Sequence, residues 1–160
     1  MSVSPQLSLP VAVILGKKTV SRGAWSVPSW RAVAVVAGEN LASAGALGSL
    51  IKDVEGEEHL LWSGLRLDLF RDSAHSYWSN LVGSEPALFV ICHEREDGGL
   101  MPILVTADQD EAGAATEANS AVYRVPIPPE VYVQLERFVV EHYKPTPPRK
   151  RKRKNWSGQG

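Results

Sequence analysis

The chain has 160 residues, of which 44% are hydrophobic and 22% are charged, close to the average for soluble globular domains. This length fits one domain, and the composition excludes collagen-like, coiled-coil and wholly disordered proteins. A single cysteine, Cys92, cannot form an internal disulfide, which excludes a disulfide-stapled secreted scaffold, and a zinc ribbon is excluded as well.

Charge is distributed unevenly along the chain. Six of the 17 basic residues are consecutive, at positions 149–154. Residues 1–148 therefore hold 11 basic and 18 acidic residues, a formal charge of −7. We expect 1–143 to form a single α+β domain and 144–160 to be a proline-rich spacer with a disordered basic tail. Such a tail is typical of an interaction arm for an acidic protein, nucleic acid or an anionic membrane surface. The six cations are Arg149, Lys150, Arg151, Lys152, Arg153 and Lys154.

Membrane insertion and export are not expected. The first apolar run, Leu9–Leu15, is too short to span a bilayer, and it lacks the preceding cations of a signal peptide. Together with the single cysteine, this pattern predicts a cytoplasmic protein.

The N-terminal half predicts strands separated by loops. Residues 10–18 are rich in valine and isoleucine and predict a strand, and residues 31–36 predict a second, short strand. The segment between them, Trp25–Trp30, encloses Pro28 and is expected to be a loop. Residues 38–58 look irregular and end in an acidic cluster at 53–58.

From His59 to Phe70 the sequence alternates with a period of two, which predicts a half-buried strand. The alternation places Leu65 and Leu67 on one face and Trp62 on the other. A short helix is expected over 73–82, with Asp72 as its N-cap and Gly83 as its stop.

The C-terminal half has clearer signals. A continuous apolar run, 87–92, predicts a strand near the sheet centre, joined by a turn at 97–99 to an antiparallel strand over 100–107. Pro102 favours an edge or a strand start for the latter. Further along, the sequence predicts a helix capped by Asp108 with Glu111, a strand over 122–127, and a final helix with an apolar stripe of Val131, Leu135, Phe138 and His142. The fold class is therefore α+β, with a mainly antiparallel sheet of about five or six short strands and a closing C-terminal helix.

No catalytic or cofactor motif stands out. Cys92 and His93 are neighbours on a predicted strand, so their side chains point to opposite faces, and Cys92 is expected to be a buried structural residue. The histidines lack metal-ligand spacing, and we expect no metal or cofactor. Two alternatives stay open: a metal site in which His59, His75 and His93 converge, and an enzyme in which Asp68, His75 and His93 converge.

Trp25 and Trp30 are candidate partner-binding residues. They stand close together in the expected loop, which is flanked by Arg22 and Arg31, and together they suggest an aromatic groove for a partner. The alternative is that both indoles pack in or over the core.

A series of short motifs runs from Val11 to Lys154. The motifs are Leu67–Arg71, Tyr77 with Asn80-Leu81, Glu85-Pro86 before Phe89-Val90, Val105–Asp108 with Glu111-Ala112, Val125–Pro128, Phe138-Val139 with Glu141-His142, the two early tryptophans and the terminal basic run. In this order they resemble the uncharacterised bacterial family catalogued as domain of unknown function 3305. The chain departs from that family in a longer, glycine-rich segment over 38–58, and in Pro147-Pro148 where an aromatic residue often stands.

The resemblance implies no established activity. Members of the family tend to be encoded beside formate dehydrogenase and molybdenum-cofactor genes, which is an associational argument for partnership. Some carry a label of molybdopterin-guanine dinucleotide biosynthesis. That label is not supported here, because Val11–Lys18 offers only Gly16 where a nucleotide-binding loop needs several glycines.

The first functional hypothesis is a non-catalytic accessory or assembly protein that acts through protein–protein contacts, for a molybdenum-dependent formate dehydrogenase or its maturation factor. The alternative is a nucleic-acid-binding regulator that uses the basic tail, although the acidic body repels nucleic acid and no helix-turn-helix is evident. The tail could also fold back on the acidic cluster at 53–58 of its own body or of a second subunit.

Overall fold

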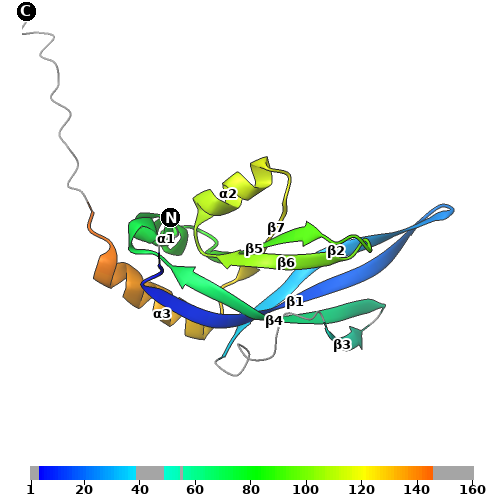
Figure 1. Ribbon diagram of the computed structural model, residues 1–160, viewed down its shortest axis with the longest axis horizontal. Helices are drawn as coiled ribbons and strands as arrows, with labels where there is room; N and C mark the ends of the chain where they lie inside the picture. Colours follow the sequence, from blue (N-terminus) through cyan, green and yellow to red (C-terminus); the bar gives the residue numbers. More distant parts are fainter. Residues whose placement is uncertain (1–3, 39–48, 55, 146–160) are drawn as a thin grey trace, which may run out of the picture.

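The computed structural model describes residues 4–38, 49–54 and 56–145 (Figure 1). The described residues form a mostly antiparallel sheet with three α-helices. Its strands are β1 (Leu7–Arg22), β2 (Trp25–Ala37), β3 (Ser49–Val54), β4 (Glu57–Leu69), β5 (Ala87–Glu94), β6 (Leu100–Thr106) and β7 (Ala121–Pro126). The helices are α1 (Ala74–Val82), α2 (Gln109–Glu117) and α3 (Pro129–His142).

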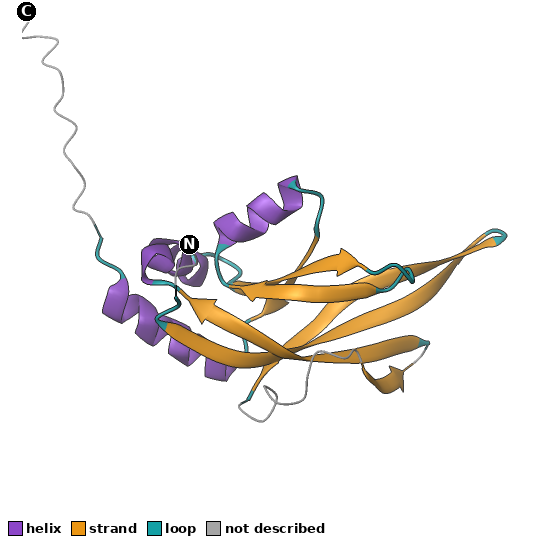
Figure 2. Cartoon of the chain, in the orientation of Figure 1, coloured by secondary structure: helices purple, strands orange, loops and turns teal. Residues whose placement is uncertain are grey.

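The sheet is mixed and nearly closes into a barrel. Its strand order is β2-β1-β4-β6-β5-β7, with β3 paired to β4, and the pairing of β4 with β6 is parallel. The two end strands approach each other, so that Trp30 of β2 and Tyr123 of β7 line one cavity. The helices lie toward one end, and the β1–β2 hairpin extends past the rest of the sheet at the other (Figure 2). The expected α+β class is confirmed.

The closing helix packs as the sequence predicts. Val131, Leu135 and Phe138 of α3 are buried in the same core cluster as Leu88 and Val90 of β5. Residues 87–92 are all buried, and β5 pairs with a strand on each side, as expected for a central strand. Cys92 is buried there as well.

The β5–β6 connection also matches its prediction. The Arg95 N–H donates to the Gly99 carbonyl at 2.7 Å, and Gly98 has a φ of +84°, which closes the hairpin. Pro102 lies opposite Cys92, beside a register shift. Because β6 meets β4 only at Val105, Pro102 lies in the half of β6 that has a single neighbouring strand.

A bulge in β4 changes the face on which Trp62 lies. Val11 pairs with Leu65 and Val13 pairs with Trp62, so β4 has one more residue than β1 between these pairs. Gly64 supplies the left-handed backbone, with a φ of +81°. Trp62 is therefore buried in the core with Leu67, and the prediction that it faces away from Leu65 and Leu67 is wrong.

The Trp25–Trp30 segment is part of β2, so the expected loop is wrong. Gly23, with a φ of +61°, begins a two-residue turn that returns the chain directly into β2. Pro28 is tolerated in this strand because antiparallel backbone groups alternate between the two edges. The hairpin closes at the pair Arg22 and Trp25, and alternation from this pair directs the Pro28 nitrogen to the outer edge of β2. No hydrogen bond to β1 is therefore lost at Pro28.

Two further expectations need correction. Residues 38–58 are not irregular throughout, because β3 pairs there with the first half of β4; residues 39–48 and 55 lie outside the described part. Asp72 does not cap α1. It lies in a single 3-10 turn before the helix, and the N-cap of α1 is Ser73, whose side chain makes no capping hydrogen bond.

The caps at the remaining helix ends follow the sequence. Gly83 is the C-cap of α1. Asp108 caps α2, its carboxylate accepting the N–H groups of Asp110 at 2.9 Å and Glu111 at 3.4 Å. Within the described ranges, no helix is long and apolar enough to cross a membrane.

Candidate functional site

The most prominent surface feature is the end of the β1–β2 hairpin, residues 17–31, which we call the arm. β4 pairs with β1 only as far as Lys18, so the arm beyond that residue is a two-stranded ribbon that projects from the sheet (Figure 1). Residues directly opposite in the two strands share a face. Arg22 is opposite Trp25 and Val20 is opposite Val27, which places these four side chains together.

The outer face of the arm is made by Lys18, Val20, Arg22, Trp25 and Val27. Trp25 is 77% exposed and Val27 is 45% exposed. An indole this exposed leaves a large apolar area in water, and it stands opposite Arg22 instead of within a core. The outer face thus combines apolar contact area with positive charge.

The inner face of the arm continues the core side of the sheet. Trp30 lies opposite Lys17, whose Nζ is 5.5 Å from the centre of the indole, and Trp30 packs against the core cluster. Trp25 and Trp30 are five positions apart on one strand, so they point to opposite faces. The structure therefore does not bring them together, and the expected shared aromatic groove is wrong.

The arm is positively charged although the protein is acidic. The first 38 residues contain no aspartate or glutamate, and their four cations, Lys17, Lys18, Arg22 and Arg31, all lie in the arm. Lys18 and Arg22 are exposed on the outer face. The arm therefore suits an acidic partner surface.

A charged network fixes the base of the arm. Arg31 donates two hydrogen bonds to the Glu57 carboxylate, at 2.8 Å from Nε and 2.7 Å from Nη2, and His59 Nε2 lies 2.7 Å from the same carboxylate. These bonds lower the pKa of Glu57 to about 2, with the Arg31 bond as the largest cause. Gly16 leaves room for the carboxylate, because a Cβ there would lie 2.9 Å from it.

Replacing Glu57 by glutamine is expected to destabilise the protein at neutral pH but not in strong acid. The folded-state pKa of Glu57 lies below its usual value of 4.5, so its stabilisation is complete above about pH 4.5 and is lost as the pH falls toward 2. Urea unfolding of the variant and the unaltered protein between pH 7 and pH 2 tests this. A difference in stability that stays constant over this range would contradict it.

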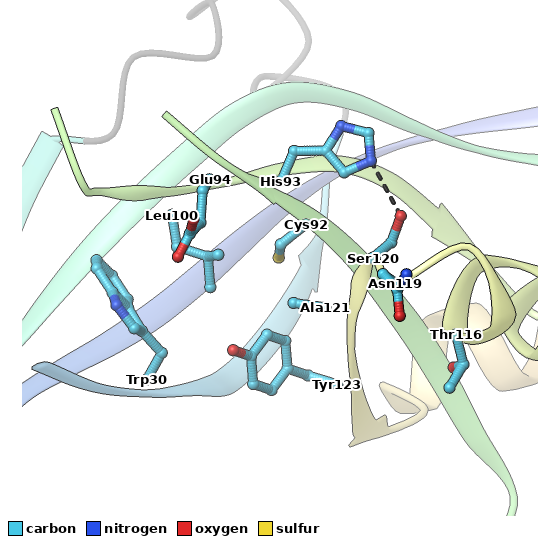
Figure 3. A pocket seen from close by; sticks show the side chains of 10 residues that line it. All are labelled: Trp30, Cys92, His93, Glu94, Leu100, Thr116, Asn119, Ser120, Ala121 and Tyr123. Carbon is cyan, nitrogen blue, oxygen red and sulfur yellow. Dashed lines mark hydrogen bonds between the residues drawn. The ribbon is translucent and has the colours of Figure 1, made fainter. Parts of the chain in front are cut away.

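An open cavity of about 810 Å³ lies at the base of the arm, at the end of the sheet where β2 and β7 approach (Figure 3). Trp30 and Tyr123 form aromatic walls, and the imidazole of His93 lies 3.1 Å from the Ser120 hydroxyl at the rim. The full lining is Trp30, Cys92, His93, Glu94, Leu100, Thr116, Asn119, Ser120, Ala121 and Tyr123.

This cavity is not assembled for nucleophilic chemistry. Burial raises the pKa of Cys92 to about 12, so its thiol stays protonated. In the described residues, no carboxylate contacts His93 to complete a triad with Ser120. The Ser120 N–H donates to the Ala115 carbonyl at 2.9 Å and is not free for an oxyanion.

The two convergence hypotheses are not supported by the described part of the chain. Asp68 accepts a hydrogen bond from Ser8, His75 stacks on Trp78 with ring centres 6.2 Å apart, and His93 faces Ser120. His59 is held by Glu57 at the base of the arm. Over 4–38, 49–54 and 56–145, no three His, Cys, Asp or Glu side chains gather as a metal site would need.

The basic tail, 149–154, lies outside the described residues, so its predicted partner-binding role stays a prediction. The predicted contact of the tail with the acidic cluster at 53–58 also stays a prediction. Sequence reasoning named Arg22 beside this segment but missed Val20 and Val27, which share the outer face with Trp25. The period-two series of Lys18, Val20 and Arg22 was the available signal.

Comparison with known proteins adds a family and nothing on activity. The family model described as "Protein of unknown function (DUF3305)" matches residues 10–154. No curated protein matches the chain. No solved structure matches it either.

Proposed function

We propose that this chain, which belongs to the DUF3305 family, is a non-catalytic accessory or assembly protein that acts through protein–protein contacts. The observation that carries the proposal is the outer face of the arm, where a 77% exposed Trp25 stands beside Arg22. Tryptophan and arginine are the residues that most often dominate the energy of protein interfaces.

The architecture of the arm supports this role. A two-stranded ribbon is marginally stable alone in water, and none of the described strands pairs with residues 19 to 28 from outside the hairpin. Contact with a partner would bury Trp25 and Val27 and order the ribbon at the same time. Pro28 has no N–H to offer an added strand at the outer edge of β2, which favours recognition through side chains over addition of a strand.

The first partner to test is a molybdenum-dependent formate dehydrogenase or its maturation factor. This choice is supported by the tendency of family members to be encoded beside such genes, and it implies a cytoplasmic location. The cations of the arm and the tail would steer an acidic partner toward the outer face, with a rate that falls as salt is added.

Affinity purification of the tagged full-length protein from its native bacterium, after nuclease treatment, tests the proposal. Trp25→Ala is expected to reduce the retained molybdoenzyme subunit or maturation factor at least tenfold. Val82→Ala is the matched control, because Val82 is 60% exposed on α1, away from the arm. Equal retention by the Trp25 variant and the unaltered protein would refute the arm as the contact surface.

Nucleic acid is the alternative partner, favoured by the four cations of the arm and the six of the tail. If all six tail cations neutralised phosphates on duplex DNA, the slope of log affinity against log salt would be about −5. Nucleic acid that co-purifies before nuclease treatment, with no protein retained after it, would favour this alternative.

A further inference from the structure

The solvent side of α3 carries a second exposed apolar feature. Val133 is 47% exposed and Val140 is 80% exposed, and their spacing of seven places them on one helix face. This face points away from the buried stripe of Val131, Leu135 and Phe138. We call Val133 and Val140, with the glutamates beside them, the α3 stripe.

The α3 stripe is acidic. Glu130 and Glu136 lie one turn on either side of Val133, and Glu141 follows Val140. Arg137 also lies on this face, between the two valines, so these four charged residues sum to −2. The outer face of the arm has the opposite character, with Lys18 and Arg22 on the same face as Trp25. The two surfaces are therefore complementary in both charge and apolar contact.

One copy of the chain cannot join these two surfaces. The arm projects at one end of the molecule, and α3 lies at the other, with the sheet between them (Figure 1). A second copy can supply the missing surface, and a two-fold axis then makes the contact twice and closes the assembly.

We infer that the outer face of the arm docks on the α3 stripe of a second copy of this chain, forming a symmetric dimer. The inference rests on the proposed function, because it uses the same contact surface. In the dimer, Trp25 is covered while no other partner is bound. An external partner must then compete with the second copy, so its binding weakens as the protein is concentrated.

Sedimentation velocity of the full-length protein over a range of concentrations measures the dimer directly. Two variants reverse one surface each: Lys18→Gln with Arg22→Glu on the arm, and Glu130→Gln with Glu136→Arg on α3. Each alone is expected to weaken dimerisation at least tenfold. An equimolar mixture is expected to restore it, because both contacts of the mixed dimer then join opposite charges. Thermal unfolding confirms that both variants are folded.

A protein that stays monomeric at all concentrations would overturn the inference. So would a dimer that neither variant weakens, or a mixture that fails to restore it. These outcomes are distinct from failure of the proposed function. A monomeric protein whose partner capture still depends on Trp25 would leave that function standing, whereas capture that is independent of Trp25 would refute the arm as the contact surface whatever the oligomeric state.

Discussion

Replacing Asn80 by leucine is expected to lower the free energy of unfolding by about 3 kcal/mol or more. Asn80 is 1% exposed, and its amide joins three backbone groups. Nδ2 donates to the carbonyls of Ala87 at 2.7 Å and Ala107 at 3.0 Å, and Oδ1 accepts the Ala87 N–H at 3.1 Å. One side chain thus ties α1 to the start of β5 and the end of β6.

Leucine has nearly the same volume but leaves all three backbone groups buried without a partner, and each such group costs about 1–3 kcal/mol. Asn80→Asp is the informative control, because a carboxylate still accepts the Ala87 N–H but cannot donate to the two carbonyls. Urea unfolding followed by circular dichroism measures both variants. A leucine variant as stable as the unaltered protein would contradict this account of the amide.

Elements with a strong local signal could be predicted from the sequence. The buried run of β5 and the stripe of α3 need no knowledge of distant residues, because an apolar run or a helical period is complete within the segment. The Asn80-Leu81 motif could be recognised too. Its role could not, because the partners of Asn80 lie 7 and 27 residues away.

Features set by pairing between strands could not be predicted. Trp25–Trp30 reads as a loop because Pro28 is a local breaker, yet pairing with β1 makes it a strand. Likewise, the bulge at Ser63–Gly64 shifts the register of β4 by one residue, and this shift exists only relative to β1.

The candidate site was predicted in part. Trp25 and Trp30 could be named from the sequence, but their separation onto opposite faces follows from the strand that replaced the expected loop. The α3 stripe was missed because Val133 and Val140 are only two apolar residues on a charged face, and isolated exposed valines are common. Their proposed role in docking depends on the arm, which lies more than a hundred residues away in sequence.

Replacing Trp62 by alanine is expected to lower the free energy of unfolding by about 3–5 kcal/mol, whereas phenylalanine should change it by about 1 kcal/mol or less. Trp62 is 3% exposed in the core, and the Arg95 guanidinium lies 5.7 Å from its ring. Its Nε1 is buried and has no hydrogen-bond partner among the described residues.

The contrast between the two variants follows from that unpaired N–H. Alanine removes the ring and leaves a cavity, while phenylalanine keeps most of the ring and eliminates a buried donor, so its two effects offset each other. Gly64→Ala tests whether the bulge holds Trp62 inward, since a φ of +81° strains any other residue by about 1 kcal/mol. Urea unfolding measures all three variants. Equal losses for alanine and phenylalanine would show that the indole N–H is satisfied after all.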